Sequence, residues 1–306
     1  MVTIFHKTIK DTEPKVLKES KTGVWVCLEE PTESEVTAVA KAHALDASLI
    51  KDALDLYEVP RIEREDGVLY VYTRVPFQEG TSVMTVPLLI ALTGSAVITV
   101  SMRQLPVFAK FKEGKLPFTT TQRIKLFLQF FTEINASYSR FLTNMSRRVR
   151  AASVQLESIT NRHVVQLVSF ENILNDFLAA LVPTSALLNT LLSGKTLKLY
   201  ATDEDLVEDI FLTNGQLIEL AKSNLKTIVN VREAYSTIMG NNLNQVLKLL
   251  TSLTILMTVP MIISSFFGMN VALPFAQSPY AFAGIVSITL LITLIIFLIF
   301  NRNRWL

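Results

Sequence analysis

Cysteine and histidine are scarce in this sequence. The single cysteine, Cys27, has no partner for a disulfide within the chain, which is typical of proteins from a reducing compartment. The three histidines, His6, His43 and His163, are scattered, and the sequence has no acid pair, nucleophile motif, phosphate-binding loop or metal-ligand spacing. These absences argue against an enzyme, and each histidine is expected to be a surface or structural residue.

Charge is absent from residues 249–301, which contain no Asp, Glu, Lys, Arg or His. Two hydrophobic segments, 249–267 and 280–300, are separated by a stretch that contains Gly and Pro. Each segment is close to the ~20 residues that a helix needs to cross ~30 Å of hydrocarbon. The sequence therefore predicts two membrane-spanning helices joined by a short loop that carries Gly268-Met269-Asn270.

Acidic residues are also absent from the C-terminal part of the chain. All 27 Asp and Glu residues lie at or before Glu233, and the charges after it are Lys248, Arg302 and Arg304. Since positive residues flank membrane helices on the cytoplasmic side, we expect a multi-pass protein of the cell membrane with both termini cytoplasmic and the connecting loop external. The net charge of +2 gives no support for nucleic-acid binding, and residues 1–10 have no apolar core of a signal peptide.

The N-terminal part combines strand and helix signals. Four segments have strand patterns: 23–28, 68–75, 83–92 and 96–101. In the first of these, Val24, Val26 and Leu28 alternate with other residues, which predicts a half-buried strand. Thr32 and Glu35 form a capping box for a helix that runs to about Ala44, and a short helix is expected over 48–56. These patterns predict a small α/β domain with a mixed or antiparallel sheet.

Long helices are predicted from about Thr120 onward. Residues 120–160 and 162–192 have apolar residues at three- and four-residue spacing, typical of an antiparallel pair with its turn near Asn161 and its end at Ser193-Gly194-Lys195. A cap at Thr202, followed by acids, begins a third helix. If that helix runs over 203–267, it is ~97 Å long at ~1.5 Å per residue. We therefore expect a stalk that projects from the soluble part into the membrane.

Six segments follow from these patterns. They are an α/β cytoplasmic domain (1–118), an antiparallel long-helix pair (119–202), a stalk that continues into the first membrane helix (203–267), an external loop (268–279), a second membrane helix (280–301) and a basic cytoplasmic tail (302–306). The expected fold class is thus an α/β domain followed by a long α-helical stalk and two C-terminal transmembrane helices.

One face of the first membrane helix is polar. Alternating steps of three and four residues collect Asn244, Leu247, Thr251, Thr254, Thr258, Met261 and Ser265. The opposite positions are aliphatic: Leu249, Leu253, Leu256 and Ile263. Small hydroxyl residues also serve helix packing in membranes, which is the alternative interpretation. We favour a water-filled pore, and because one helix encloses nothing, the pore requires a homo-oligomer.

Several motifs match a known family. Gly268-Met269-Asn270 follows the first span, residues 241–251 are similar to the family's segment before the membrane, and Arg304-Trp305-Leu306 matches its basic-Trp-Leu terminus. Three soluble segments are also similar: Ile50-Lys51-Asp52-Ala53-Leu54, Pro60-Arg61-Ile62-Glu63 and Leu206-Val207-Glu208-Asp209. Over nearly its whole length, the chain resembles the CorA family of divalent-cation (magnesium) transport proteins.

The resemblance implies a funnel-shaped homopentamer in the lipid bilayer that takes up hydrated Mg²⁺, or Co²⁺ or Ni²⁺, without an organic cofactor. Asn270 would form a ring of side-chain carbonyls at the outer mouth, beside Gly268 and Met269, and hydrogen-bond the hydrated ion. A helix C-cap is the alternative role for Asn270. The polar stripe would line the pore as far as Asn244, and Leu247 and Leu250 are candidates for a gate that closes by dewetting.

The same resemblance implies a regulatory metal site. Asp52 and Asp209 fall where the family places an acidic pair between neighbouring subunits. Carboxylates facing each other repel until a cation bridges them, so cytoplasmic Mg²⁺ is expected to hold the pore closed. The alternative is that both are solvated surface acids, and Lys51, at a position often acidic in the family, weakens the site.

Two departures from the family pattern leave the transported ion open. The external loop has no acid to concentrate cations, and the basic tail is reduced to Arg302 and Arg304. A zinc or other transition-metal transporter of the same superfamily, with or without proton coupling, is the main alternative, although the stripe has no thiolate or imidazole ligand. A membrane-anchored sensor that transports nothing is a more distant alternative and would need no polar stripe.

Overall fold

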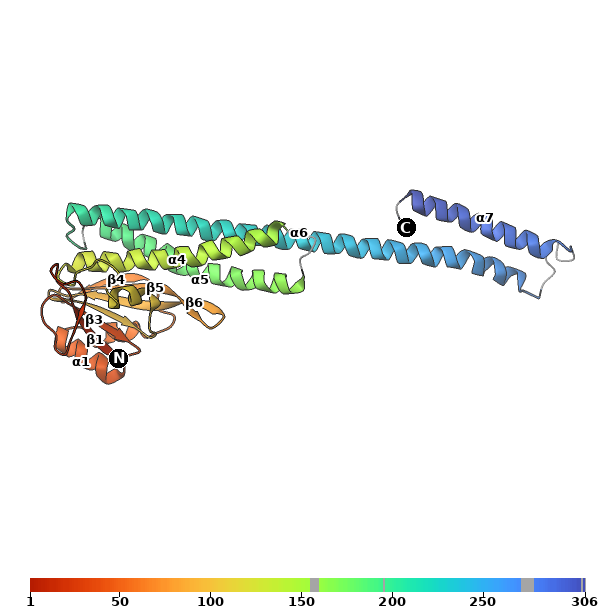
Figure 1. The fold of residues 1–306 in the computed structure, drawn as a ribbon. Coiled ribbons are helices and arrows are strands. Elements are labelled where there is room, and N and C mark those ends of the chain that lie inside the picture. The colour runs from red at the N-terminus through yellow and green to blue at the C-terminus, as the bar shows by residue number, and fades with distance from the viewer. Residues whose placement is uncertain (155–159, 195, 271–277, 304, 306) are drawn as a thin grey trace. The chain divides into compact units, whose positions relative to one another are not determined.

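The structure is a computed structural model that describes residues 1–154, 160–194, 196–270, 278–303 and 305 (Figure 1). It consists of two compact units, Met1–Val231 and Arg232–Leu306. Three parts of the sequence interpretation lie outside the described residues: most of the external loop (271–277), Lys195 of the predicted helix end, and Arg304 and Leu306 of the predicted terminus.

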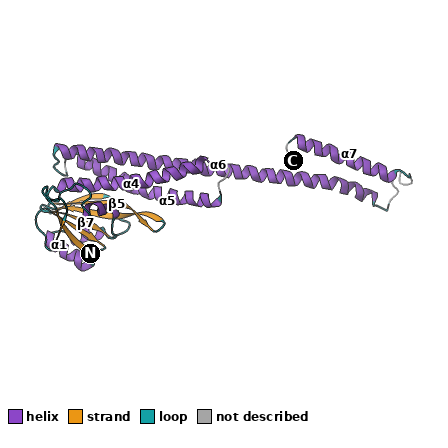
Figure 2. Cartoon of the chain, viewed as in Figure 1, coloured by secondary structure: helices purple, strands orange, loops and turns teal. Residues whose placement is uncertain are grey.

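A mixed sheet forms the centre of the first unit (Figure 2). Its strands among the described residues, in spatial order, are β2 (Lys15–Leu17), β1 (Val2–His6), β3 (Val24–Glu29), β7 (Ala96–Ser101), β6 (Ser82–Leu92), β5 (Val68–Glu79) and β4 (Arg61–Glu65). β3 and β7 are parallel, with Val24 opposite Ala96, and the other neighbours are antiparallel. The predicted mixed sheet is confirmed, whereas β1, β2 and β4 were not predicted.

Helices cover both faces of this sheet (Figure 1). α1 (Glu33–His43) and α2 (Ala47–Asp52) pack on the face that carries Val26 and Tyr70. The other face is covered by α4 (Arg123–Val154) and α5 (Asn161–Leu192), together with the short helices η1 (Pro106–Phe108) and α3 (Ala109–Lys112).

Trp25 anchors the second face of the sheet. Its ring is buried, stacks on Phe5 and meets Phe108 and Phe130, and its indole Nε1 donates a 2.9 Å hydrogen bond to Thr99. Val26, the next residue, lies on the opposite face of the sheet and is equally buried under α1. The prediction of a half-buried strand over 23–28 is therefore wrong, because helices from distant parts of the chain cover both faces of β3.

The first two helices match the sequence prediction in part. Thr32 and Glu35 make the predicted capping box, and α1 ends at His43 with Ala44 in the left-handed region. The second helix ends at Asp52 and does not reach Leu56. The chain leaves the helix through consecutive turns, in which Leu54 N donates to Lys51 O and Asp55 N to Asp52 O.

The starts of α4 and α5 differ from the predicted bounds, whereas α5 ends at Leu192 as predicted. α4 begins at Arg123 because Thr120 is held by the residues next to β1 and β3: its N–H donates to Lys7 O (2.8 Å) and its hydroxyl to Gly23 O (2.5 Å). Asn161, predicted to turn, is the first residue of α5, and Thr160 caps it. Gly194 follows the end of α5 with a φ of +69°, as expected for a glycine at a helix end.

α6 (Ala201–Phe267) is continuous, as predicted, but begins before the expected cap, so Thr202 lies in its first turn. Its first part completes a helical bundle with α4 and α5 in the first unit. Buried side chains recur along one face: Val207, Ile210, Asn214, Leu217, Ala221, Asn224, Ile228 and Val231. Asn135 Nδ2 donates to Ile210 O (3.0 Å), and Asn214 Nδ2 donates to Leu181 O (2.9 Å). These amide bonds fix the register of the three helices.

By length and composition, three helices in the described residues could cross a membrane: residues 163–192 of α5, α6, and α7 (Ala281–Arg302). Burial separates them, because 33% of the apolar window in α5 is buried, against 6% in α6 and 0% in α7. The buried side of α5 includes Leu174, Phe177 and Leu181 and packs within the first unit. The apolar character of α5 is thus explained by the core, which leaves the end of α6 and α7 as the spans predicted from the sequence.

Candidate functional site

The predicted polar stripe lies on the uncovered part of α6 in the second unit. Asn244, Leu247, Thr251, Thr254, Met261 and Ser265 are exposed, and Thr258 is half-buried. Within the described residues 232–270, Ser252 is the only buried side chain. A single chain therefore encloses no path along the stripe, and any path must form between copies.

The threonines of the stripe have a defined hydrogen-bonding state. Thr254 Oγ1 donates to Leu250 O (2.9 Å), and Thr258 Oγ1 donates to Thr254 O (2.7 Å). Each hydroxyl has one hydrogen, which is used within the helix, so the lone pairs of the oxygen remain available as acceptors. The stripe therefore presents hydrogen-bond acceptors at its surface.

Leu247 and Leu250 are 49% and 60% exposed. They precede Thr251 and Thr254 by about one turn of α6. Neither leucine has a covering partner in the second unit that would bury it. Exposed apolar side chains at this position are available for contact with other copies or with lipid.

The Gly-Met-Asn segment ends α6 by ordinary backbone bonds. Gly268 N donates to Ser264 O (3.0 Å) and Ser265 O (3.2 Å), and Met269 N donates to Phe266 O. Neither Gly268 nor Asn270 is among the described residues with positive φ. Asn270 is exposed and lies beyond these bonds, so the alternative role of a left-handed Asn cap is not observed. A Cβ on Gly268 would lie 3.4 Å from Ser264 O, an ordinary contact.

The end of α7 contacts α6 through Trp305. Trp305 N donates to Phe300 O (3.0 Å), and the two rings stack with centroids 5.4 Å apart. The hydroxyl of Ser252 donates to Lys248 O (2.7 Å) and lies 3.5 Å from Trp305 O, and Ser252 is fully buried. Sequence reasoning missed Ser252, which lies off the polar stripe. The serine in an aliphatic stretch was the signal that could have identified it.

Asp52 of the predicted regulatory pair is already paired with a cation. Its Oδ2 lies 2.8 Å from Arg61 Nη2, and Arg61 also pairs with Glu58 and Glu63. The guanidinium lies 4.0 Å from the ring centroid of Tyr72. Burial acts to lower the pKa of Arg61, but the hydrogen bonds to Glu58 and Glu63 outweigh it and raise the pKa above its usual value. Arg61 is therefore a permanent positive charge beside Asp52.

Lys51 and Asp209 have other surroundings. Lys51, which was expected to weaken the site, pairs with Glu33 of α1, with its Nζ 3.4 Å from Glu33 Oε1. Asp209 is exposed on α6. No hydrogen bond or ion pair joins Asp52 to Asp209 in the part of the chain that the structure describes, and no cluster of three or more His, Cys, Asp or Glu side chains there could hold a metal. One chain does not assemble the regulatory site.

Comparisons with known proteins identify the family of the chain. Residues 20–302 match the family model described as CorA-like Mg²⁺ transporter protein. The cobalt/magnesium transport protein CorA of Methanocaldococcus jannaschii is 26% identical over 293 residues, which cover 92% of this chain and 91% of that protein.

Two solved structures share the fold along the whole chain. The complete CorA magnesium transporter from Methanocaldococcus jannaschii superposes with a TM-score of 0.88 at 21% identity, covering 100% of this chain and 99% of that chain. The full-length CmaX protein gives a TM-score of 0.74 at 15% identity, with 99% and 97% covered. At these identities the superpositions show only the fold. The family assignment rests on the family model, which matches residues 20–302. The chain belongs to the CorA-like Mg²⁺ transporter family.

Proposed function

We propose that this chain forms a homopentameric channel that carries hydrated Mg²⁺ across the cell membrane, with both termini in the cytoplasm. Family membership supports transport rather than catalysis, and the name of the Methanocaldococcus jannaschii relative supports magnesium and cobalt as cargo. The channel needs no organic cofactor. Its pore is lined by the polar stripe of α6, with Gly268, Met269 and Asn270 at the outer mouth.

The observation that carries this proposal is the acceptor character of the stripe. Mg²⁺ releases its octahedral shell of waters reluctantly, and those waters direct hydrogens outward. A wall for the hydrated ion must therefore accept hydrogen bonds. Thr254 and Thr258 already donate their hydroxyl hydrogens to α6 carbonyls, so both offer acceptors only. The side-chain carbonyl of Asn270 would add a ring of acceptors where the ion enters.

An assembly of copies follows from the exposure of the second unit. Polar side chains in a membrane face a water-filled cavity or other helices and avoid lipid. No element of the described chain covers Asn244, Thr251 or Thr254. Packing of several α6 helices around one axis would turn these residues inward and leave the aliphatic positions and α7 toward lipid.

The gate and the regulatory site complete the proposal. Leu247 and Leu250 form a ring of apolar side chains that closes by dewetting. Asp52 of one copy and Asp209 of the next bind cytoplasmic Mg²⁺ and favour the closed state. Arg61 weakens this site, because it neutralises part of the negative charge at Asp52.

Ion-resolved uptake into proteoliposomes tests the proposal. Purified chain is reconstituted, and uptake of Mg²⁺, Co²⁺, Ni²⁺ and Zn²⁺ is followed with and without a pH gradient. We expect Mg²⁺ uptake that needs no gradient. Absence of flux for every ion would leave only a non-transporting role, and Zn²⁺ uptake that depends on the gradient would favour the coupled transition-metal carrier.

A matched pair of substitutions tests the acceptor wall. Thr258→Val keeps the branched shape but removes the acceptor, so Mg²⁺ uptake should fall severalfold, whereas Thr258→Ser should retain it. Thr289→Val in α7 is the control, because Thr289 makes the same type of bond, to Ile285 O (2.8 Å), on the other helix. Equal loss in Thr258→Val and Thr289→Val would mean that the hydroxyls serve helix packing.

A further inference from the structure

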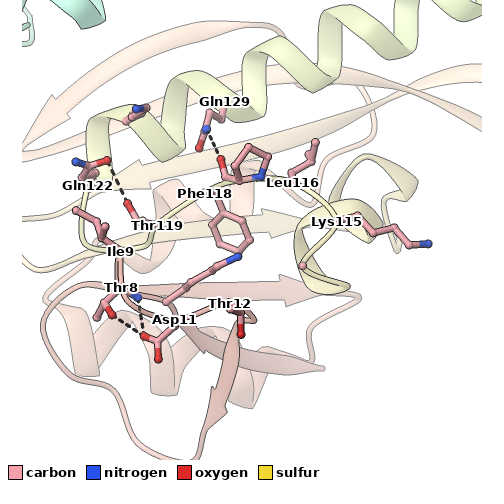
Figure 3. A pocket seen from close by; sticks show the side chains of 14 residues that line it. Thr8, Ile9, Asp11, Thr12, Lys115, Leu116, Phe118, Thr119, Gln122 and Gln129 are labelled. Atoms are coloured by element: carbon pink, nitrogen blue, oxygen red, sulfur yellow. Dashed lines mark hydrogen bonds between the residues drawn. The ribbon is translucent and has the colours of Figure 1, made fainter.

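A cavity of about 610 Å³ lies in the first unit beside the start of α4 (Figure 3). Its wall comes from three segments that are distant in the sequence: the loop after β1, the segment that leads into α4, and the first turns of α4. The volume falls within the ~300–1,000 Å³ typical of small-molecule sites. The cavity uses none of the residues of the proposed conduction path.

The strongest feature of this wall is the ammonium group of Lys7, a residue that is otherwise almost fully buried. Lys7 is 5% exposed, and its Nζ lies 4.9 Å from the ring centroid of Phe118. Its backbone is held on both sides by Thr120, whose hydroxyl accepts from Lys7 N (2.9 Å) and whose N–H donates to Lys7 O (2.8 Å). Within the described residues, the ammonium has no carboxylate partner and no hydrogen-bond acceptor. A charged group on a side chain that is largely buried is normally paired.

The other charges of the wall add to this positive character. Asp11 is occupied, because it pairs with Lys15 (2.5 Å) and accepts from Thr8 N (2.9 Å) and Thr8 Oγ1 (2.6 Å). These bonds, that from Lys15 foremost, hold the pKa of Asp11 well below its usual range. Lys125 in the first turn of α4 is exposed and has no ion pair in the described chain. Lys115 instead pairs with Glu113 (2.6 Å) and extends away from the cavity in Figure 3.

The N-terminal end of α4 also favours a bound anion. Its first turn contains no acid, and the first N–H groups of a helix have no carbonyl partner within the helix. Such an end attracts anions, phosphate in particular. Cationic residues at this end are unfavourable for the helix by itself, whereas a bound anion would reverse their effect.

The amide of Gln129, also in the wall, favours a ligand that carries a hydrogen-bond donor in addition to its negative charge. Gln129 Nε2 donates to Pro117 O (2.9 Å), and Figure 3 shows this bond above the cavity. Its Oε1 is buried and has no hydrogen-bond partner within the described residues. An acceptor in this position suits a ligand that carries a hydroxyl or amino group, and Ile9 and Leu116 provide apolar contact beside it.

We propose that this cavity binds a phosphate ester, a small molecule with a phosphate group and at least one hydroxyl or amino group. The phosphate pairs with Lys7, Lys125 and the first N–H groups of α4. The side-chain carbonyl of Gln129 accepts a hydrogen bond from the remainder of the ligand. Nucleotides and sugar phosphates both meet this description.

Calorimetric titration of the full chain in detergent tests the site. Ribose 5-phosphate, AMP, ATP and inorganic phosphate are the probes, and EDTA is present so that no Mg²⁺ complex contributes. At least one ester should bind, and Lys7→Met should weaken that binding by about tenfold or more, as expected for the loss of one charge-assisted contact. Lys10→Met is the matched control, because Lys10 is an exposed residue of the same loop, and its affinity should not change.

A second pair of variants keeps the test decisive if Lys7→Met does not fold. Lys125→Met, at an exposed position, should weaken every ester, and Gln129→Met should weaken the esters because it removes the acceptor for their hydroxyl or amino group. Absence of binding of all four probes at millimolar concentration would overturn the proposal, as would equal affinity in the parent and in these variants. Inorganic phosphate that binds as tightly as ribose 5-phosphate would overturn the assignment of an ester. AMP and ribose 5-phosphate together separate a requirement for the base from recognition of the sugar phosphate.

Discussion

Arg61 joins Asp52 to the aromatic core of the first unit. Its Nη2 lies 2.8 Å from Asp52 Oδ2, while its guanidinium lies 4.0 Å from the ring centroid of Tyr72. The hydroxyl of Tyr72 in turn donates to Leu49 O (2.6 Å), one turn before Asp52 in α2. The carboxylate of the proposed regulatory pair is thus oriented by an internal cation, so any Mg²⁺ that binds there competes with Arg61.

Replacement of this cation should strengthen the response to Mg²⁺. In Arg61→Gln, Asp52, Glu58 and Glu63 lose their common partner, and the local negative charge rises. We expect Mg²⁺ to protect the chain from limited proteolysis at severalfold lower concentration than in the parent. The variant should also be less stable without Mg²⁺, by about 1–3 kcal/mol, because a partly buried group of charges is left unpaired.

Lys51→Gln is the control for this substitution, because Lys51 pairs with Glu33 and not with Asp52. Its Mg²⁺ midpoint should match that of the parent. The combined change Asp52→Asn and Asp209→Asn should remove the protection altogether. An unchanged midpoint in Arg61→Gln, together with unchanged protection in the double variant, would exclude this pair from regulation.

The outer mouth is tested at Asn270. Asn270→Ala removes a side chain that has no partner in the described chain, so the fold and the assembly should persist while divalent-cation uptake is lost. Size-exclusion chromatography reports the assembly and proteoliposome flux reports uptake. Asn301→Ala, at an exposed amide near the end of α7, should transport normally. Full flux in an assembled Asn270→Ala variant would contradict the proposed selectivity ring.

The hydrophobic gate is tested by polar substitutions on two faces of α6. Leu247→Ser and Leu250→Ser should wet the constriction and raise the basal conductance measured in planar bilayers at high Mg²⁺. Leu253→Ser, on the aliphatic face, should leave that conductance unchanged. If all three variants conduct like the parent, the constriction lies at other residues.

The stability of the first unit should depend on pH through two histidines. Burial lowers the pKa of His43, whose Nε2 lies 3.2 Å from Ser20 Oγ, and burial and then the charge of Lys21 lower the pKa of His6. The unfolded chain binds these protons at about pH 6.5, before the folded chain does. The free energy of unfolding should therefore be constant above about pH 7 and fall as the pH drops below about 6.5.

Urea denaturation between about pH 7.5 and about pH 5.5 measures this slope. The double variant His6→Gln and His43→Gln should have a flatter profile than the parent. Asp11, Glu35 and Asp46 do not interfere, because hydrogen bonds lower the pKa of each of these carboxyls further below this range. Identical slopes in the two proteins would assign the pH dependence to other groups.

Local signals in the sequence predicted the elements that local interactions define. The capping box of Thr32 and Glu35 and the apolar periodicity of α4, α5 and α6 depend on residues a few positions apart. β4 was missed because four of its five residues are charged, which is possible only for an edge strand paired on one side, here with β5. β2 is another edge strand. It has three residues and pairs only with β1, so it is too short to show a strand pattern of its own.

The features of the candidate site also differ in whether local patterns predict them. The polar stripe and the Gly-Met-Asn segment depend on helical periodicity and on sequence position, so the sequence predicted both. The pairs Arg61–Asp52 and Ser252–Trp305 form between different elements, so no local pattern predicts either of them. Whether the stripe lines a pore depends on the packing of several copies, which the periodicity of one helix does not determine, and it stays a prediction.

The placement of the two tryptophans makes the chain its own fluorescent probe. Trp25 is fully buried in the first unit, whereas Trp305 is 37% exposed and stacked on Phe300 in the second, and the sequence contains no other tryptophan. Their emission maxima should therefore differ, with Trp25 at the shorter wavelength. Replacement of either residue by Phe leaves a single emitter, so that denaturation of each unit can be followed optically without an added label.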